Sequence, residues 1–182
     1  AAMVYVTGIP TEEKFSSHSD IPALKRKLGL KEDVFSVLVA TGSFGIGPIE
    51  EIVDNLKGMQ ILVICGHNQK LFERLNQKAD SLVKVYGFVD NMDELMAVSD
   101  AMITKPGGLS ISEALVIGLP LIFFNAIPGQ EENNVRVLAV YGVGVSGCPV
   151  SEMAHILKNF QMSSEDLSEA RLRSRNLGRP NA

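Results

Sequence analysis

Two polar turns, each directly after an apolar run, carry residue types that would bind a phosphorylated sugar. The first lies within residues 103–114 (ITKPGGLSISEA), where two glycines leave backbone N–H groups unhindered at the start of an expected helix. A helix N-terminus of this kind attracts phosphate. The second turn, residues 128–134 (PGQEENN), starts another helix with amide and carboxylate groups suited to sugar hydroxyls. A diphosphate joined to a sugar would therefore satisfy both turns.

Glu113 follows the first of these turns and has two interpretations. As a functional residue, its carboxylate would accept hydrogen bonds from two ribose hydroxyls. As a structural residue, it would be the capping-box partner of Ser110, three residues earlier. In both cases we expect Glu113 in the first helical turn, where the helix dipole favours a carboxylate.

A glycine-rich loop at residues 41–47 (TGSFGIG) follows the apolar run that ends at Ala40. Its glycines would let the backbone approach an anion, and Ser43 would add a hydroxyl donor. The spacing matches neither the dinucleotide fingerprint nor the P-loop, so an ordinary turn between strand and helix explains it equally well. The second glycine turn, expected at the same edge of the sheet, favours anion binding.

A further loop, residues 87–92 (GFVDNM), has an apolar pair, Phe88 and Val89, that would sandwich a planar base. For an isolated motif, a hydrophobic staple of the next helix is the better explanation. The second polar turn could equally be a solvated helix start with a cap. Four loops at one edge of a sheet, each suited to one part of a nucleotide sugar, favour the ligand interpretation.

Seven apolar runs separated by helical segments predict the fold that would bring these loops together. The runs are continuous rather than alternating, which indicates strands buried on both faces and hence a parallel sheet. Strand–helix alternation predicts a Rossmann-like, doubly wound α/β domain. The expected strands are residues 3–6, 34–40, 60–65, 82–86, 101–104, 119–124 and 142–145.

Helical spacing of apolar residues appears between most of these runs. A helix over residues 21–28 would be closed by Gly29, and a final helix with a frayed tail would begin at about residue 163. Asn91 is the expected N-cap of a short helix that carries Met92, Leu95 and Met96. Two further apolar faces consist of Ile49, Ile52, Val53 and Leu56, and of Leu71, Leu75 and Ala79 with Phe72 beside them. Ser112, Ala114, Leu115 and Val116 belong to an expected small-residue helix that packs tightly on the sheet.

Composition limits the class of protein. A chain of 182 residues, 46% of them hydrophobic, is long enough for one globular domain with a substantial core. Its net charge of −4 argues against binding to nucleic acid. Neither Cys65 nor Cys148 has metal-ligand spacing, and we expect no metal or other cofactor. Cys65 is expected to be a small buried residue in a reducing, cytosolic setting. The longest apolar stretch, residues 114–127, is interrupted and too short to span a bilayer.

The tract of residues 103–113, together with residues 128–131, resembles the diacylglycerol glycosyltransferases of glycosyltransferase family 28. It is similar, more distantly, to the enzyme that adds N-acetylglucosamine in peptidoglycan lipid synthesis. The resemblance runs from residues 6–10 (VTGIP) to the strand expected near Val145. It implies the C-terminal half of a GT-B fold, in which two Rossmann-like domains face a cleft. Residues 1–182 would then be the donor domain, and the acceptor domain with the catalytic base would lie outside this chain.

The resemblance also implies a role for each candidate residue, while no residue of this chain corresponds to the catalytic base. The diphosphate would be held by Ser43 and the N–H groups of Gly108, Leu109 and Ser110, the ribose by Glu113, the uracil by the backbone of Val89, and the donor hexose by Gln130 and Glu131. One position departs from the family. Members often carry Val-Arg after the Gly-x-Pro near the start, with the arginine near the base, and here the pair is Thr11-Glu12. This departure leaves the uracil contact open.

The resemblance implies a reaction in which a hexose passes from a UDP-sugar to a lipid acceptor, namely diacylglycerol, with inversion and without a metal ion. It also implies a cytoplasmic protein with peripheral contact to the inner face of the cell membrane. Two alternatives stay open. One is a UDP-sugar epimerase of the same GT-B architecture, and the other is a non-catalytic nucleotide-binding module with a degenerate site.

Overall fold

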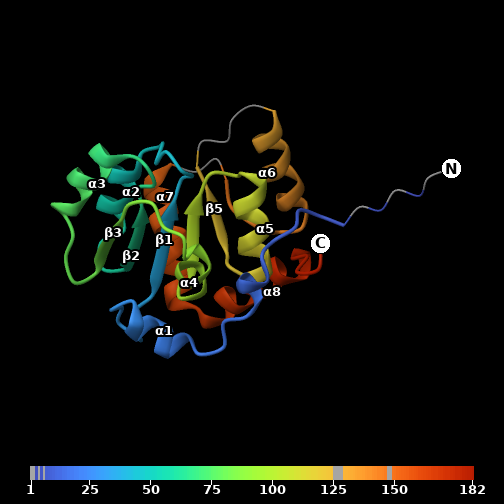
Figure 1. The fold of residues 1–182 in the computed structure, drawn as a ribbon, viewed down its shortest axis with the longest axis horizontal. Helices are drawn as coiled ribbons and strands as arrows, with labels where there is room; N and C mark the ends of the chain where they lie inside the picture. Colours follow the sequence, from blue (N-terminus) through green and yellow to red (C-terminus); the bar gives the residue numbers. More distant parts are fainter. Residues whose placement is uncertain (1–2, 4, 6, 125–128, 147–148) are drawn as a thin grey trace.

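The computed structural model describes residue 3, residue 5 and residues 7–124, 129–146 and 149–182. These residues form a central sheet with helices on both faces (Figure 1). Pro128 of the second polar turn and Cys148 lie outside the described residues.

The sheet has five parallel strands in the order β3-β2-β1-β4-β5. The chain moves outward from β1 to β3 and then crosses back to β4 on the other side of β1. The order therefore reverses between β1 and β4, and open α/β sheets bind ligands outside the carboxyl ends of the strands at such a switch point. The strands are β1 (Ser36–Ala40), β2 (Gln60–Ile64), β3 (Val83–Tyr86), β4 (Ala101–Thr104) and β5 (Leu121–Phe123).

Successive residues of each central strand enter two different cores. In β1, Val37 and Val39 pack on one face of the sheet, whereas Leu38 and Ala40 pack on the other. All five residues of β1 and of β2 are buried, as a strand covered on both faces requires. The continuous apolar runs of the sequence therefore correctly predicted a doubly wound sheet.

Helices cover both faces of the sheet (Figure 1). Helices α2, α3 and α7 contribute to one core, and α4, α5 and α6 to the other. The bounds are a 3₁₀ turn η1 (Glu13–Ser16) and helices α1 (Ile21–Lys27), α2 (Ile49–Asn55), α3 (Gln69–Asn76), α4 (Met92–Ala97), α5 (Gly108–Ile117), α6 (Gln130–Val140), α7 (Val150–Met162) and α8 (Ser164–Leu177).

The helix predictions hold with small changes. Helix α3 ends at Asn76, so Ala79 lies outside it. Asn91 takes the N-cap position of α4, but its side chain donates to Glu94 Oε2 at 2.9 Å rather than accepting from a helix N–H. Helix α7 was not predicted, although Met153, Ala154 and Leu157 are buried against the sheet.

Two predicted strands are wrong. For the strand expected at residues 3–6, the described residues Met3 and Tyr5 belong to no strand and are 77% and 72% exposed, and the other two lie outside the described residues. Residues 142–145 make only a single parallel bridge, between Val145 and Ile122 of β5. Gly142 and Gly144 have φ values of +64° and +78°, and a strand cannot continue through that left-handed conformation.

None of the helices in the described part of the chain is long and apolar enough to cross a membrane.

Candidate functional site

A cavity of about 380 Å³ lies at the carboxyl ends of the central strands. Loops after β1, β2 and β3, the start of α5 and the segment around η1 line it. Five of the eight residues predicted from the sequence line this cavity: Ser43, Val89, Leu109, Ser110 and Glu113. Gly108 precedes Leu109 as the first residue of α5. The topology therefore brings the phosphate, base and ribose candidates together, from three of the four loops that the sequence singled out.

A backbone hydrogen bond joins the loop after β1 to the loop after β2. His67 donates its backbone N–H to the carbonyl of Ser43 at 2.7 Å. Gly66 makes this approach possible, because a Cβ at that position would lie 2.2 Å from the Ser43 carbonyl oxygen. Gly66 also has a φ of +58°, which favours glycine. The position of Ser43 in the cavity thus depends on a neighbouring loop.

Helix α5 presents its first turn to the cavity. Gly107 is the N-cap, in an extended conformation and without a side-chain cap. The first intrahelical bond of this turn runs from Ile111 N to Gly107 O at 3.1 Å. The N–H groups of Gly108, Leu109 and Ser110 precede that bond and need acceptors from outside the helix. Together with the positive end of the helix dipole, they can hold a phosphate.

The start of α5 corrects the interpretation of Glu113. Because the helix begins at Gly108, Ser110 already lies inside its first turn and cannot be the N-cap. The capping box between Ser110 and Glu113 is therefore wrong, and so is the placement of Glu113 in the first turn. Glu113 lies in the second turn, where its carboxylate lines the cavity.

The electrostatic environment of Glu113 is unusual for a carboxylate. Burial raises the pKa of Glu113 to about 7, and the negative charge of Glu12 adds to the shift while Lys14 opposes it. Desolvation disfavours a charged form that has too few donors around it. A ligand that brings two hydroxyl donors would supply what this carboxylate lacks.

Glu12 and Lys14 also line the cavity, and sequence reasoning assigned no role to Lys14. Lys14 Nζ lies 3.3 Å from Glu12 Oε2 and 3.9 Å from Asp93 Oδ1. Asp93 is buried and pairs with His18, with 2.8 Å between Asp93 Oδ2 and His18 Nε2. The only sequence signal for Lys14 was its position two residues after Glu12, the acidic residue at which the chain departs from the family pattern.

The loop after β3 separates the two members of its apolar pair. Val89 packs against the core and also lines the cavity. Phe88 is 63% exposed and stacks on the ring of His67, with 4.7 Å between centroids and 16° between planes. The two residues therefore do not form a symmetric sandwich, but both line the cavity.

Gln130 and Glu131 do not line this cavity. They are the first residues of α6, which follows β5, the neighbour of β4 in the sheet. Asn134 joins the two turns, because its Nδ2 donates to the carbonyl of Pro106 at 2.9 Å. The alternative explanation of this turn, a helix start with a cap, is supported in part. The backbone N–H of the N-cap residue Gly129 donates to Glu132 Oε2 at 3.4 Å.

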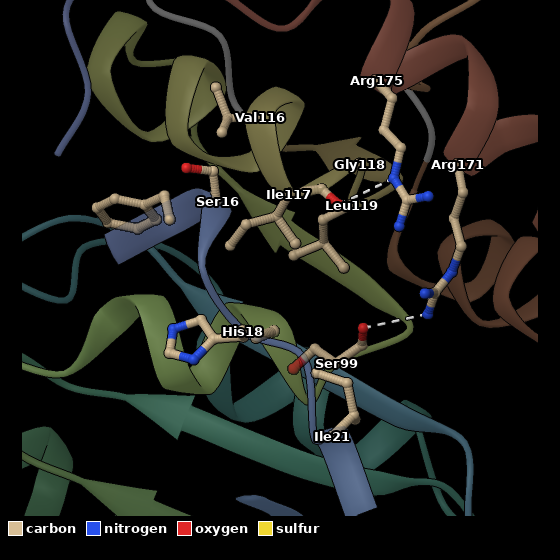
Figure 2. Close-up of a pocket in the computed structure, with 12 residues that line it drawn as sticks. Ser16, His18, Ile21, Ser99, Val116, Ile117, Gly118, Leu119, Arg171 and Arg175 are labelled. Atoms are coloured by element: carbon tan, nitrogen blue, oxygen red, sulfur yellow. Dashed lines mark hydrogen bonds between the residues drawn. The ribbon is translucent and has the colours of Figure 1, made fainter. Parts of the chain in front are cut away.

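A second cavity, of about 260 Å³, lies between η1, the C-terminal ends of α4 and α5, and α8 (Figure 2). Arg171 and Arg175 extend into it from α8. Arg171 donates to the carbonyl of Ser99 at 3.3 Å and to Asp100 Oδ1 at 2.8 Å, and Arg175 Nε donates to the carbonyl of Ile117 at 3.3 Å. Cations at helix C-termini satisfy carbonyls that lack intrahelical partners. These arginines therefore attach α8 to the ends of α4 and α5.

Among the residues that the structure describes, no three His, Cys, Asp or Glu side chains cluster as metal ligands would. Cys65 is buried as predicted, and burial raises the pKa of its thiol to about 11. A thiol in that state is not a nucleophile at neutral pH.

Residues 26–146 match the family model described as the glycosyltransferase family 28 C-terminal domain. The processive diacylglycerol beta-glucosyltransferase of Bacillus subtilis (strain 168) is 34% identical over 150 residues, covering 78% of this chain and 39% of that enzyme. The Nicotiana tabacum protein named "Probable monogalactosyldiacylglycerol synthase, chloroplastic" is 36% identical over 195 residues, covering 97% of this chain and 36% of that protein. The chain thus spans less than half the length of these relatives.

Solved structures with the same fold include the glycosyltransferase WaaG and the protein HepE. WaaG, involved in lipopolysaccharide biosynthesis, has a TM-score of 0.73 at 19% identity, covering 93% of this chain and 50% of WaaG. HepE of Anabaena, solved in complex with UDP, has a TM-score of 0.72 at 19% identity, covering 92% of this chain and 50% of HepE. These neighbours confirm the expected α/β fold of a GT-B domain.

Proposed function

The chain belongs to glycosyltransferase family 28, and we propose that residues 1–182 form the donor-binding domain of an enzyme that transfers a hexose from a UDP-sugar to diacylglycerol. The observation that carries the proposal is the cavity at the switch point of the sheet, where the open first turn of α5 and the half-buried Glu113 meet. The names of the sequence relatives support the lipid acceptor. The acceptor would bind to a domain outside this chain.

The diphosphate would bind at the start of α5. The N–H groups of Gly108, Leu109 and Ser110 would donate to its oxygens, and the Ser43 hydroxyl would donate from the loop after β1. Charge accumulates on the leaving diphosphate as the glycosidic bond breaks. Fixed N–H groups and a helix dipole stabilise that charge without reorganisation, which is the usual form of electrostatic catalysis. The chemistry on this side of the reaction therefore needs no metal ion.

The nucleoside would occupy the end of the cavity near η1 and α4. Glu113 would accept hydrogen bonds from both ribose hydroxyls, and the backbone of Val89 would contact the uracil. The hexose would extend from the diphosphate toward the start of α6, where Gln130 and Glu131 would contact its hydroxyls. Direct displacement at the anomeric carbon would invert its configuration, with the base supplied by the acceptor domain.

Calorimetric titration of the chain with UDP, CDP and UDP-glucose tests the proposal. We expect saturable binding of UDP and UDP-glucose and weaker binding of CDP. Absence of binding to all three would refute a donor domain and favour a non-catalytic module. In the full-length protein, product analysis with UDP-glucose and diacylglycerol should show a glycolipid, whereas epimerised UDP-sugar or its breakdown would refute the transferase.

A further inference from the structure

The proposed donor cavity has an unfavourable charge balance for its ligand. Four charged residues of the described chain line it: Glu12, Lys14, Asp90 and Glu113. Three are acidic, and Lys14 is the only lysine or arginine among them. The donor itself is an anion through its diphosphate. Lys14 therefore provides the only positively charged side chain that the described lining offers against four sources of negative charge.

The Lys14 ammonium is held loosely. Its separations of 3.3 Å from Glu12 and 3.9 Å from Asp93 exceed the 2.7–2.9 Å or so of a strong charge-assisted hydrogen bond. The Lys14 side chain is 39% exposed and that of Glu12 is 73% exposed, so water screens the pair. Asp93 is already paired with His18. Moving the ammonium off Glu12 would break no strong interaction.

The position of Lys14 indicates which end of the ligand its ammonium would contact. Asp93, within 4 Å of its ammonium, lies in the first turn of α4, which directly follows the loop that contains Val89. Phe15, the next residue, lines the same cavity. Lys14 also acts electrostatically on Glu113. The ammonium thus lies next to α4, which follows the loop assigned to uracil, and within electrostatic reach of the carboxylate assigned to ribose.

We propose that Lys14 is the cationic binding residue of the donor site, and that its ammonium leaves Glu12 to donate to an oxygen of the uridine half of the ligand. This inference rests on the proposed function.

A second effect follows from the same geometry. The charged and titratable groups around Glu113 are Glu12 and Lys14 on the segment at η1, and Asp90 on the loop after β3, with the Asp93–His18 pair behind Lys14. Lys14 is the cation that opposes the upward shift of the Glu113 pKa. Removing Lys14 should therefore make Glu113 ionise at higher pH. The pH midpoint of nucleoside binding should rise with it.

The test compares wild type with Lys14→Met, Lys14→Arg and the matched control Lys27→Met. Lys27 pairs with Glu94 on the surface and lies outside the cavity. UDP affinity is measured by calorimetry and uridine affinity by ligand-observed NMR, both from pH 5.5 to 8.5. Circular dichroism and thermal melting establish that each variant is folded.

We expect Lys14→Met to weaken UDP and uridine by the same factor, about tenfold, and to move the pH midpoint of binding upward. Lys14→Arg should retain most affinity, and Lys27→Met should match wild type. A folded Lys14→Met variant with wild-type affinity and midpoint would overturn the inference. A loss for UDP without a loss for uridine would also overturn it, because the ammonium would then contact the diphosphate. If wild type itself binds neither ligand, the proposed function fails instead.

Discussion

Replacing Glu113 with glutamine should make the protein more stable at alkaline pH and worse at binding UDP. Glutamine keeps the size and the oxygen of glutamate but carries no charge. In the folded protein, burial raises the pKa of the Glu113 carboxyl from 4.5 to about 7. The folded state therefore binds the proton more tightly than the unfolded state does. Stability is present in full below about pH 4.5 and is lost as the pH rises to about 7.

The magnitude follows from the size of the shift. One pKa unit corresponds to about 1.4 kcal/mol, so the full shift would be worth about 3 kcal/mol. Glu113 is half-buried, and solvent screening reduces this to roughly 1–2 kcal/mol. Glu113→Gln should thus be about 1–2 kcal/mol more stable than wild type above pH 7 and nearly equal below pH 4.5. For a chain of this length the melting temperature should rise by about 2–4 °C per kcal/mol.

Ligand binding should change in the opposite direction. The variant loses a charged acceptor for two ribose hydroxyls, and a hydrogen bond to a charged group contributes roughly 1.5–3 kcal/mol. UDP affinity at pH 8 should therefore fall by about tenfold to a hundredfold. In wild type, UDP affinity should rise with pH through about 7, and in Glu113→Gln that dependence should disappear.

Scanning calorimetry at pH 4.5 and 8, with UDP titrations at both, checks these expectations. Glu152→Gln, an exposed change on α7, is the matched control and should alter neither property. A loss of stability at pH 8, or unchanged UDP affinity, would show that Glu113 is a structural residue. The combination of higher stability and lower affinity is typical of functional residues held in an unfavourable environment.

Three further outcomes are expected. Gln130→Ala and Glu131→Ala in the full-length enzyme should weaken UDP-hexose binding and transfer but leave UDP affinity nearly unchanged; equal losses for both ligands would assign these residues a structural role. Gly66→Ala should destabilise the chain by about 1–3 kcal/mol and weaken UDP binding, because the new Cβ meets the Ser43 carbonyl. Gly58→Ala has a similar positive φ but open space, so thermal melting of the pair separates the clash from the backbone cost. The 182-residue chain should bind UDP yet form no glycolipid from UDP-glucose and diacylglycerol, and robust synthesis would refute the division between domains.

The parts of the fold that were predicted depend on local sequence. The run that ends at Ala40 is apolar at every position of β1 except Ser36 because β1 is buried on both faces, and that pattern needs no knowledge of the partner strands. Gly42 and Gly107 identify the turns after β1 and β4, and a glycine at a turn is likewise a local feature of the sequence. The strand order was not predicted, but the parallel arrangement alone brings the carboxyl ends together. This was enough to group Ser43, Ser110 and Glu113.

The failures arise where distant segments decide the outcome. Lys14 enters the cavity because the segment at η1 folds across α4 and α5, which no local pattern reveals. The capping box at Ser110 was a plausible local motif, yet Gly107 starts the helix earlier. Val145 reaches only a single bridge because Gly142 and Gly144 turn the chain before a strand can form. Sequence spacing gives the residue types of the site, whereas their partners depend on the tertiary structure.

The order of the strands gives the proposed donor site a linear layout. From β3 through β1 and β4 to β5, successive loops carry the candidates for uracil, diphosphate and hexose, which is the order of these groups along the donor molecule. Neighbouring strands lie about 4.8 Å apart, so the uracil and hexose candidates lie on separate segments, whereas α5 carries both the ribose and the diphosphate candidates. Under this assignment, the choice of sugar could change during evolution through the edge segment alone. Members of a family could thus use different donor sugars while keeping the same nucleotide-binding segments.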